Sequence, residues 1–254
     1  MSLPPVPAGS GRHPILVVAI SAPDLPASSA FYARVFQWTL NPVMEGRIAA
    51  LAPGGPAIVL RGGLPAGSPG AVPFIGVPDA DAGLERIVAA GGQVDRAPWP
   101  VPGVGTLAQF RDPSGTTWGL LAPATPVAPA PVPAPFGENP KPAANSICSI
   151  EMHSATEEAA ARFFGELFGW GTLPTMPQYL MFDPGAGIGG VFQTHTPAAP
   201  AMPYIWVTDV AATLAAVEAA GGARQGEPAS MPGMATFGYF RDPSGTGMGL
   251  MGPA

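Results

Sequence analysis

The sequence FRDPSGT at residues 110–116 returns unchanged at residues 240–246, and each copy is followed by a Gly-Leu pair. Asp112, Pro113 and Gly115 occupy the positions that these residue types prefer in a type I turn. The Asp side chain can also bond to the backbone two residues on. Because apolar residues alternate on both sides, each copy predicts a strand–turn–strand hairpin.

The repetition extends over nearly the whole chain. FYARVFQW at residues 31–38 is similar to FFGELFGW at residues 163–170, and AAGG at residues 89–92 returns at residues 219–222. A Pro- and Ala-rich stretch separates the copies and favours an extended linker. We therefore expect a flexible leader at residues 1–12, a first domain at 13–123, a linker at 124–144 and a second domain at 145–254.

Composition excludes several classes of protein. The chain has 254 residues, of which 47% are hydrophobic and 11% charged, so it can bury a core despite its 34 Gly and 35 Pro. The net charge of −6 and the lack of a basic run argue against a nucleic-acid partner. No apolar run is long enough to span a membrane. The single cysteine is compatible with a reducing compartment, so we expect a cytoplasmic location.

Local signals predict the secondary structure of each copy. Asp24, Asp79, Thr156 and Asp209 are expected to cap helices. The expected strands of the first copy are residues 14–21, 47–52, 57–61 and 72–77, with a loop at 98–103 before the hairpin. Those of the second copy are residues 149–153, 179–182, 188–193 and 204–207, again before the hairpin.

The two aromatic helices, the AAGG helix end and DPSG before the last strand together resemble the vicinal oxygen chelate superfamily, which includes glyoxalase I, bleomycin-resistance proteins and extradiol dioxygenases. The resemblance implies an α+β fold of tandem vicinal oxygen chelate domains. Each domain would consist of paired βαβββ modules whose curved sheets enclose clefts. Fold alone does not give function, so the candidate sites are considered by residue.

The metal ligands of the family are not found at the matching positions of this chain. The resemblance places those positions at Val17, Val59, Val72 and Gly119 in the first repeat, and at Ser149, Val191, Met202 and Gly249 in the second. These side chains offer no imidazole, carboxylate or thiolate for a transition metal. We therefore expect neither a metal nor another cofactor. Gly119 and Gly249 are expected to leave room in the clefts.

Polar candidates concentrate in the second repeat. Ser149, Glu151 and His153 alternate on one side of a strand, where the first repeat has Val17, Ala19 and Ser21. The other ligand-binding candidates are Gln193, His195 and Arg61. Glu151 and His153 are also the catalytic candidates, since an acid and an imidazole can transfer protons. Alternatively, Glu151 bonds to backbone amides or an arginine and His153 is a half-exposed strand end.

Three functions stay open at this point. The first is that the chain binds a small organic molecule without metal, in an apolar, aromatic inter-module cleft between the repeats. The second is that it is a glyoxalase-like lyase or isomerase that uses Glu151 and His153 without the usual metal. The third is that its Pro-rich linker docks a protein partner. The expected partner is a small-molecule ligand, with no nucleic acid and no membrane. We expect the repeats to form an intrachain pseudo-dimer, and a homodimer of the whole chain stays open.

Overall fold

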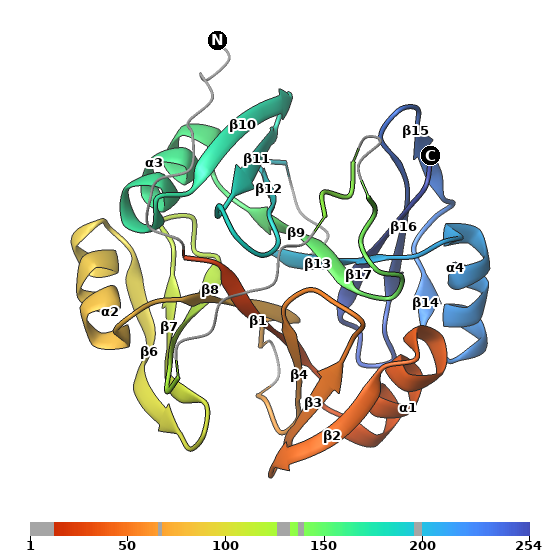
Figure 1. Cartoon of the computed structure of the whole chain (residues 1–254), viewed down its shortest axis with the longest axis horizontal. Coiled ribbons are helices and arrows are strands. Elements are labelled where there is room, and N and C mark those ends of the chain that lie inside the picture. Colours follow the sequence, from red (N-terminus) through yellow and green to blue (C-terminus); the bar gives the residue numbers. More distant parts are fainter. Residues whose placement is uncertain (1–12, 66–67, 126–132, 137–139, 196–199) are drawn as a thin grey trace. The chain divides into compact units, whose positions relative to one another are not determined.

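A computed structural model describes residues 13–65, 68–125, 133–136, 140–195 and 200–254. The expected leader lies outside the described residues. Figure 1 labels the elements in chain order. Those of the first repeat are β1 Ile15–Ser21, α1 Leu25–Phe36, β2 Thr39–Met44, β3 Arg47–Leu51, β4 Ala57–Arg61, β5 Ala71–Gly76, α2 Ala80–Ala89, β6 Gln93–Val101, β7 Gly105–Arg111 and β8 Thr117–Pro123.

The second repeat follows the same order with short edge strands near its end. Its elements are β9 Ile147–His153, α3 Glu157–Phe168, β10 Gly171–Met176, β11 Tyr179–Asp183, β12 Gly190–Gln193, β13 Ala201–Trp206, α4 Val210–Ala219, β14 Ala223–Arg224, β15 Ala229–Met231, β16 Ala235–Arg241 and β17 Gly247–Gly252.

Each repeat forms one mixed sheet. Within the described residues, the first sheet has the strand order β2-β3-β4-β1-β5-β8-β7-β6 and the second has the order β10-β11-β12-β9-β13-β17-β16-β14, with β15 paired to β16. Strands β5 and β8 are parallel, as are β13 and β17. The hairpins β7–β8 and β16–β17 are antiparallel and enclose the two FRDPSGT turns. The predicted α+β architecture of tandem βαβββ modules is confirmed.

Helix starts follow the predicted caps. The side chains of Asp24, Asp79, Thr156 and Asp209 each accept a hydrogen bond from the backbone amide three residues later. This bond satisfies an amide at the helix start that has no partner within the helix. All four predicted helix starts are confirmed.

Strands β2 and β10 were not predicted, and one predicted loop is wrong. Strands β2 and β10 are the first in their sheets, and each contains a proline next to a register shift. Proline lacks the backbone N–H that a central strand donates to its neighbour, so a segment that contains proline does not read as a strand in the sequence even where it forms an edge strand. The loop expected at residues 98–103 is largely strand, because β6 continues to Val101 and also contains two register shifts.

The chain forms two compact units, and each contains modules of both repeats. The first unit, called unit 1, contains β5–β8 with α2 and, from the second repeat, α3 with β10–β12. The second, called unit 2, contains α1 with β2–β4 and, from the second repeat, β13–β17 with α4. Strand β1 divides after Val17 and β9 divides after Ile150.

The core of unit 1 is aromatic. The ring of Trp118 on β8 lies 4.6 Å from that of Phe164 on α3, and Phe164 lies 4.8 Å from Phe192 on β12. Trp170 stacks on Phe182 at 4.9 Å. Because these rings come from both repeats, neither repeat completes this core with its own residues.

Unit 2 has a corresponding core around α1. Phe31 and Phe36 lie 6.0 Å and 5.9 Å from Phe240 on β16, and Tyr32 stacks on Trp38 at 4.9 Å. Each FRDPSGT turn also bonds to the first strand of the other repeat within its unit. Thr116 donates to the His153 carbonyl at 3.0 Å, and Thr246 donates to the Ser21 carbonyl at 3.2 Å.

Candidate functional site

A cluster of polar side chains lies on one face of the unit 1 strands β11 and β12. Leu180 and Phe192 point into the core and are fully buried. Since side chains alternate along a strand, Tyr179 and Gln193 point to the opposite face. The two residues are direct cross-strand partners, so their side chains lie next to each other.

The end of β9 brings His153 to this cluster. The Ser154 amide donates to the Gln193 carbonyl at 2.9 Å, which places the C-terminal ends of β9 and β12 side by side. His153 Nδ1 and Gln193 Oε1 are both buried, and neither has a hydrogen-bond partner among the described residues. Gln193 as a whole is only 1% exposed to solvent.

Buried polar atoms of this kind need an explanation. A buried donor or acceptor without a partner destabilises a protein by about 1–3 kcal/mol. Native proteins retain few such groups, and strain, a catalytic role or a bound water or ion accounts for those that persist. Gln193 Oε1 accepts a hydrogen bond, while His153 Nδ1 donates or accepts according to its tautomer.

Tyr179 and His195 add a hydrogen-bonded pair to the cluster. The Tyr179 hydroxyl and His195 Nε2 are 2.7 Å apart, and the two ring centroids are 5.2 Å apart. A phenol bonded to an imidazole can pass or share a proton, so the pair can orient a polar ligand. Tyr179 was not among the predicted site residues. Its pairing with Gln193 depends on the strand register, which the sequence alone did not define.

The predicted site residues divide between the two units. His153, Gln193 and His195 come together in unit 1, and Glu151 is half-buried on the same strand, two residues before His153. Ser149 and Arg61 belong to unit 2.

Arg61 has a second arginine beside it. Its cross-strand partner on β3 is Arg47, which donates to the carbonyls of Gly46 and Gly62. This arginine pair corresponds in the first repeat to Tyr179 and Gln193 in the second. The two repeats therefore differ in charge at matching positions.

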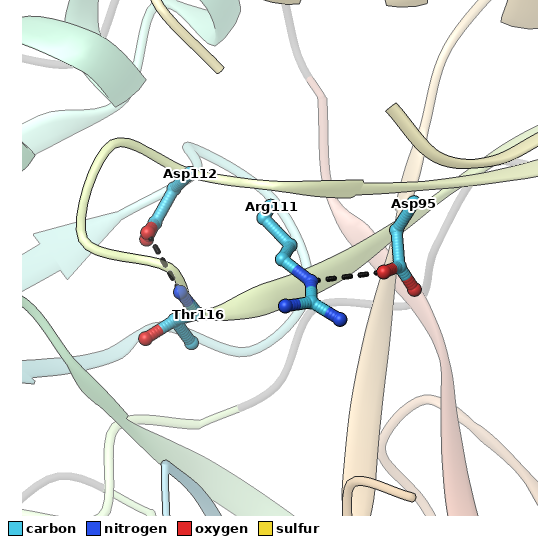
Figure 2. Close-up of polar contacts among 4 residues, drawn as sticks. All are labelled: Asp95, Arg111, Asp112 and Thr116. Atoms are coloured by element: carbon cyan, nitrogen blue, oxygen red, sulfur yellow. Dashed lines mark hydrogen bonds and ion pairs between the residues drawn. The ribbon is translucent and has the colours of Figure 1, made fainter. Parts of the chain in front are cut away.

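Two buried carboxyl groups, those of Asp112 and Asp242, lie outside this cluster. Each accepts hydrogen bonds from backbone amides of its own hairpin turn. Asp112 Oδ1 accepts from the amides of Ser114 at 2.8 Å and Thr116 at 3.0 Å, and Oδ2 accepts from the Trp118 indole at 3.2 Å. Burial raises the pKa of Asp112 to about 6, although these donors lower it. Figure 2 shows the Asp112 carboxylate directed at Thr116. The role of Asp112 is to fix the turn.

Arg111 beside this turn forms an ion pair. Its Nε lies 2.9 Å from Asp95 Oδ1 on β6, as drawn in Figure 2. The repeated residue Arg241 instead donates to the Gly245 carbonyl of its own turn at 2.9 Å. Both arginines therefore serve the hairpin region rather than the polar cluster.

The expectation that Gly119 and Gly249 leave room is wrong. A Cβ at Gly119 would overlap the ring of Phe74, and one at Gly249 would overlap the ring of Tyr204. These aromatic residues are the direct partners of the glycines on the neighbouring parallel strands. The glycines accept an aromatic ring, so neither position could carry a metal-ligating side chain without a large rearrangement.

The metal implied by the family resemblance does not fit these positions. Val, Met, Ser and Gly provide no ligand set for Zn²⁺, Mn²⁺ or Fe²⁺. In the described parts of the chain, no three His, Cys, Asp or Glu side chains are grouped in a way that could hold a metal ion.

Comparisons with known proteins agree with this fold. Residues 15–120 match the family model described as Glyoxalase/Bleomycin resistance protein/Dioxygenase superfamily. Proteins named "Putative glyoxylase CFP32" from Mycobacterium bovis and Mycobacterium tuberculosis are 27% identical over 256 residues, which cover 93% of this chain and 94% of the relative.

Two solved structures share the fold over almost the whole chain. A Mn(II)-bound glyoxalase from Novosphingobium aromaticivorans has a TM-score of 0.65 at 17% identity, covering 97% of this chain and 83% of that one. The 2,3-dioxygenase LapB from Pseudomonas sp. KL28 has a TM-score of 0.63 at 14% identity, covering 96% and 92%. At these identities the likeness concerns the fold alone. No described helix of this chain is long and apolar enough to cross a membrane.

Proposed function

Because residues 15–120 match the model of the Glyoxalase/Bleomycin resistance protein/Dioxygenase superfamily, we propose that this chain is a member of that superfamily and binds a small polar organic molecule without using a metal. The binding site is the polar cluster of unit 1, formed by His153, Tyr179, Gln193 and His195, with Glu151 on the same strand. The observation that carries the proposal is the pair of buried atoms without partners, His153 Nδ1 and Gln193 Oε1.

The geometry also supports a particular chemistry for the ligand. Gln193 Oε1 requires an N–H or O–H donor, and His153 Nδ1 complements either a donor or an acceptor. Tyr179 and His195 supply further hydrogen bonds beside them. A hydroxy acid, an amide or a similar compound with adjacent donors and acceptors matches this set. Glu151 favours a ligand that presents a donor, since a carboxylate accepts hydrogen bonds only.

A thermal-shift screen of chelator-treated protein tests this proposal. We expect at least one hydroxy acid or amide to raise the melting temperature without added metal. His153→Phe keeps a ring of similar shape but removes Nδ1, so it should weaken binding of that compound at least about tenfold, as expected for one lost hydrogen bond. Gln225→Leu, an exposed substitution in unit 2, is the control. Binding that requires Mn²⁺ or Zn²⁺ and ignores His153→Phe would contradict the proposal.

The second candidate is a glyoxalase-like lyase or isomerase that uses Glu151 and His153 without the usual metal. The same unit 1 face favours it, since an acid, two imidazoles and a phenol lie on neighbouring strands and can move protons. Chelator-treated protein in a glyoxalase assay distinguishes the two. Turnover that is lost in both Glu151→Gln and His153→Phe supports the enzyme, and binding without turnover supports the first candidate.

A further inference from the structure

The first FRDPSGT turn contacts the strand end that carries His153. Thr116 Oγ1 donates to the His153 carbonyl at 3.0 Å, and the Ala155 amide donates to Ser114 Oγ at 2.8 Å. The hydroxyl oxygens of Ser114 and Ser154 are 3.2 Å apart. All of these residues belong to unit 1. The turn therefore binds three successive residues, 153–155, of which His153 is the last of β9.

The directions of these hydrogen bonds follow from the donors that are present. A serine hydroxyl has one proton, and Ser154 donates it to the Thr156 carbonyl at 3.0 Å. Because that proton is used, the Ser114 hydroxyl donates to Ser154 Oγ and at the same time accepts from the Ala155 amide. An alanine in place of Ser114 would remove both bonds.

The contact is buried and extends to the second strand of the polar cluster. Asp112 holds the turn, since its carboxylate accepts from the amides of Ser114 and Thr116. Thr116 is 3% exposed and Ser154 is 1% exposed. Hydrogen bonds away from water are stronger, so they restrict the backbone more firmly. The Ser154 amide also donates to the Gln193 carbonyl, which links the turn to β12 as well as to β9.

The second FRDPSGT turn makes a smaller contact with the matching strand end in unit 2. Thr246 donates to the Ser21 carbonyl at 3.2 Å, as its counterpart does to His153. Ser21 is followed by Ala22 and Pro23, which match the two residues after His153. Alanine has no hydroxyl and proline has no backbone N–H. The two bonds that the serine of the first turn makes to the strand end therefore have no equivalent in unit 2.

The serine of the second turn bonds to a helix instead. Ser244 Oγ lies 2.8 Å from Ser28 Oγ on α1. Because the two turns are identical in sequence, the difference comes from the residues that follow each strand. The additional bonds occur at the strand end that carries the imidazole of His153, and not at the one that carries Ser21.

We propose that Ser114 and Thr116 are positioning residues, which hold the backbone at residues 153–155 so that His153 and Gln193 present their buried polar atoms to a ligand. This inference rests on the proposed function, because it concerns the same site. Both hydroxyls bond to the strand end itself. They act on the ligand through β9 and do not touch it.

The first measurement observes His153 without a ligand. The chain has three histidines, so NMR signals from isotope-labelled histidine are assigned to His153 by their loss in His153→Phe. We expect Thr116→Val and Ser114→Ala to shift and broaden these signals. Thr116→Ser keeps the hydroxyl and should restore them. The matched variants of the second turn, Thr246→Val and Ser244→Ala, should leave the signals unchanged, because they act in unit 2.

The second measurement is the binding of lactamide, which has a hydroxyl beside an amide. We expect Thr116→Val and Ser114→Ala to weaken binding by about threefold to tenfold. The matched variants of the second turn should bind as the natural protein does, and a cooperative melting transition in every variant shows that it is folded.

Two results would overturn the proposal. One is an equal change of the His153 signals in the variants of both turns. The other is a lower melting temperature in the first-turn variants with unchanged His153 signals, since the turn would then serve stability alone. If neither lactamide nor any other compound of the thermal-shift screen binds the natural protein, the proposed function is contradicted. The His153 signals then decide by themselves whether the turn positions this residue.

Discussion

The hydroxyl of Tyr32 on α1 donates to Asp242 Oδ2 at 2.9 Å, across 210 residues of sequence, whereas the corresponding oxygen of Asp112 accepts from the indole of Trp118. The two FRDPSGT turns are identical in sequence, but each completes its carboxylate with a different donor. In unit 2 the donor comes from the other repeat, and in unit 1 it comes from the same hairpin. Tyr32 is fully buried, and burial, with the charge of Asp242, raises its pKa.

This difference predicts unequal effects of the same substitution. In Asp242→Asn the new amide can donate to Tyr32, because a hydroxyl both donates and accepts. In Asp112→Asn the amide faces the Trp118 N–H, which only donates. We therefore expect Asp112→Asn to be less stable than Asp242→Asn by about 1–2 kcal/mol in urea unfolding. Equal losses would show that the donor type does not matter.

Asp112 also predicts a dependence of stability on pH. Its pKa is raised from 3.8 to about 6 in the folded protein. Between these values the folded protein binds a proton that the unfolded chain lacks, so this group contributes stability that is complete below about pH 4 and lost as the pH rises through 6. Measured at pH 5 and pH 7, the unfolding free energy of the natural protein should rise on acidification relative to Asp112→Asn. Parallel profiles would contradict the assignment.

The glycines under the aromatic rings predict a steric effect. Gly119→Ala adds a Cβ where the Phe74 ring lies, so it should destabilise the protein by roughly 1–3 kcal/mol, as overpacking does. In the Phe74→Ala background the same change should have little effect, because the ring is gone. Thermal melting of the four proteins measures this coupling. Gly91→Ala would not serve as a control for this steric effect. Gly91 has φ +92, so alanine there is strained by the backbone conformation and not by a neighbouring side chain.

The exchange of modules predicts the behaviour of separated repeats. The core of each unit contains rings from both repeats. If residues 1–123 or 124–254 were expressed alone, the aromatic rings of each half would therefore lack their partners and would be exposed to solvent. We expect each half to self-associate or to melt without cooperativity, and the two mixed together to form a stable complex. Size-exclusion chromatography and calorimetry are the measurements. Two monomeric halves that melt cooperatively would contradict this prediction.

The predictable parts of the molecule depend on short stretches of sequence. The FRDPSGT turns and the four helix caps involve residues within a few positions of each other, so local chemistry defines them. Strands β2 and β10 were missed because their prolines occur at irregular sheet edges. The room expected at Gly119 was wrong because Phe74, which fills it, is distant in sequence and adjacent only through the parallel pairing.

The candidate site was predicted only in part for the same reason. Alternation along one strand identified Glu151 and His153, and Gln193 and His195 followed from a second strand. Tyr179 becomes visible only when the register pairs it with Gln193. The packing of Phe136 against the buried cluster around Tyr204 and Trp206 is a contact between the linker and the sheet that no local pattern indicates.

The measurement that tests the central claim most directly compares stability and ligand binding in Gln193→Leu. Leucine has a similar volume and no oxygen, so it removes a buried acceptor without a partner. If Gln193 binds a ligand, the free energy of unfolding of the variant should be about 1–2 kcal/mol higher than that of the natural protein. A compound that stabilises the natural protein should no longer stabilise the variant. A less stable variant that still binds that compound would show that Gln193 is structural and would contradict the proposed site.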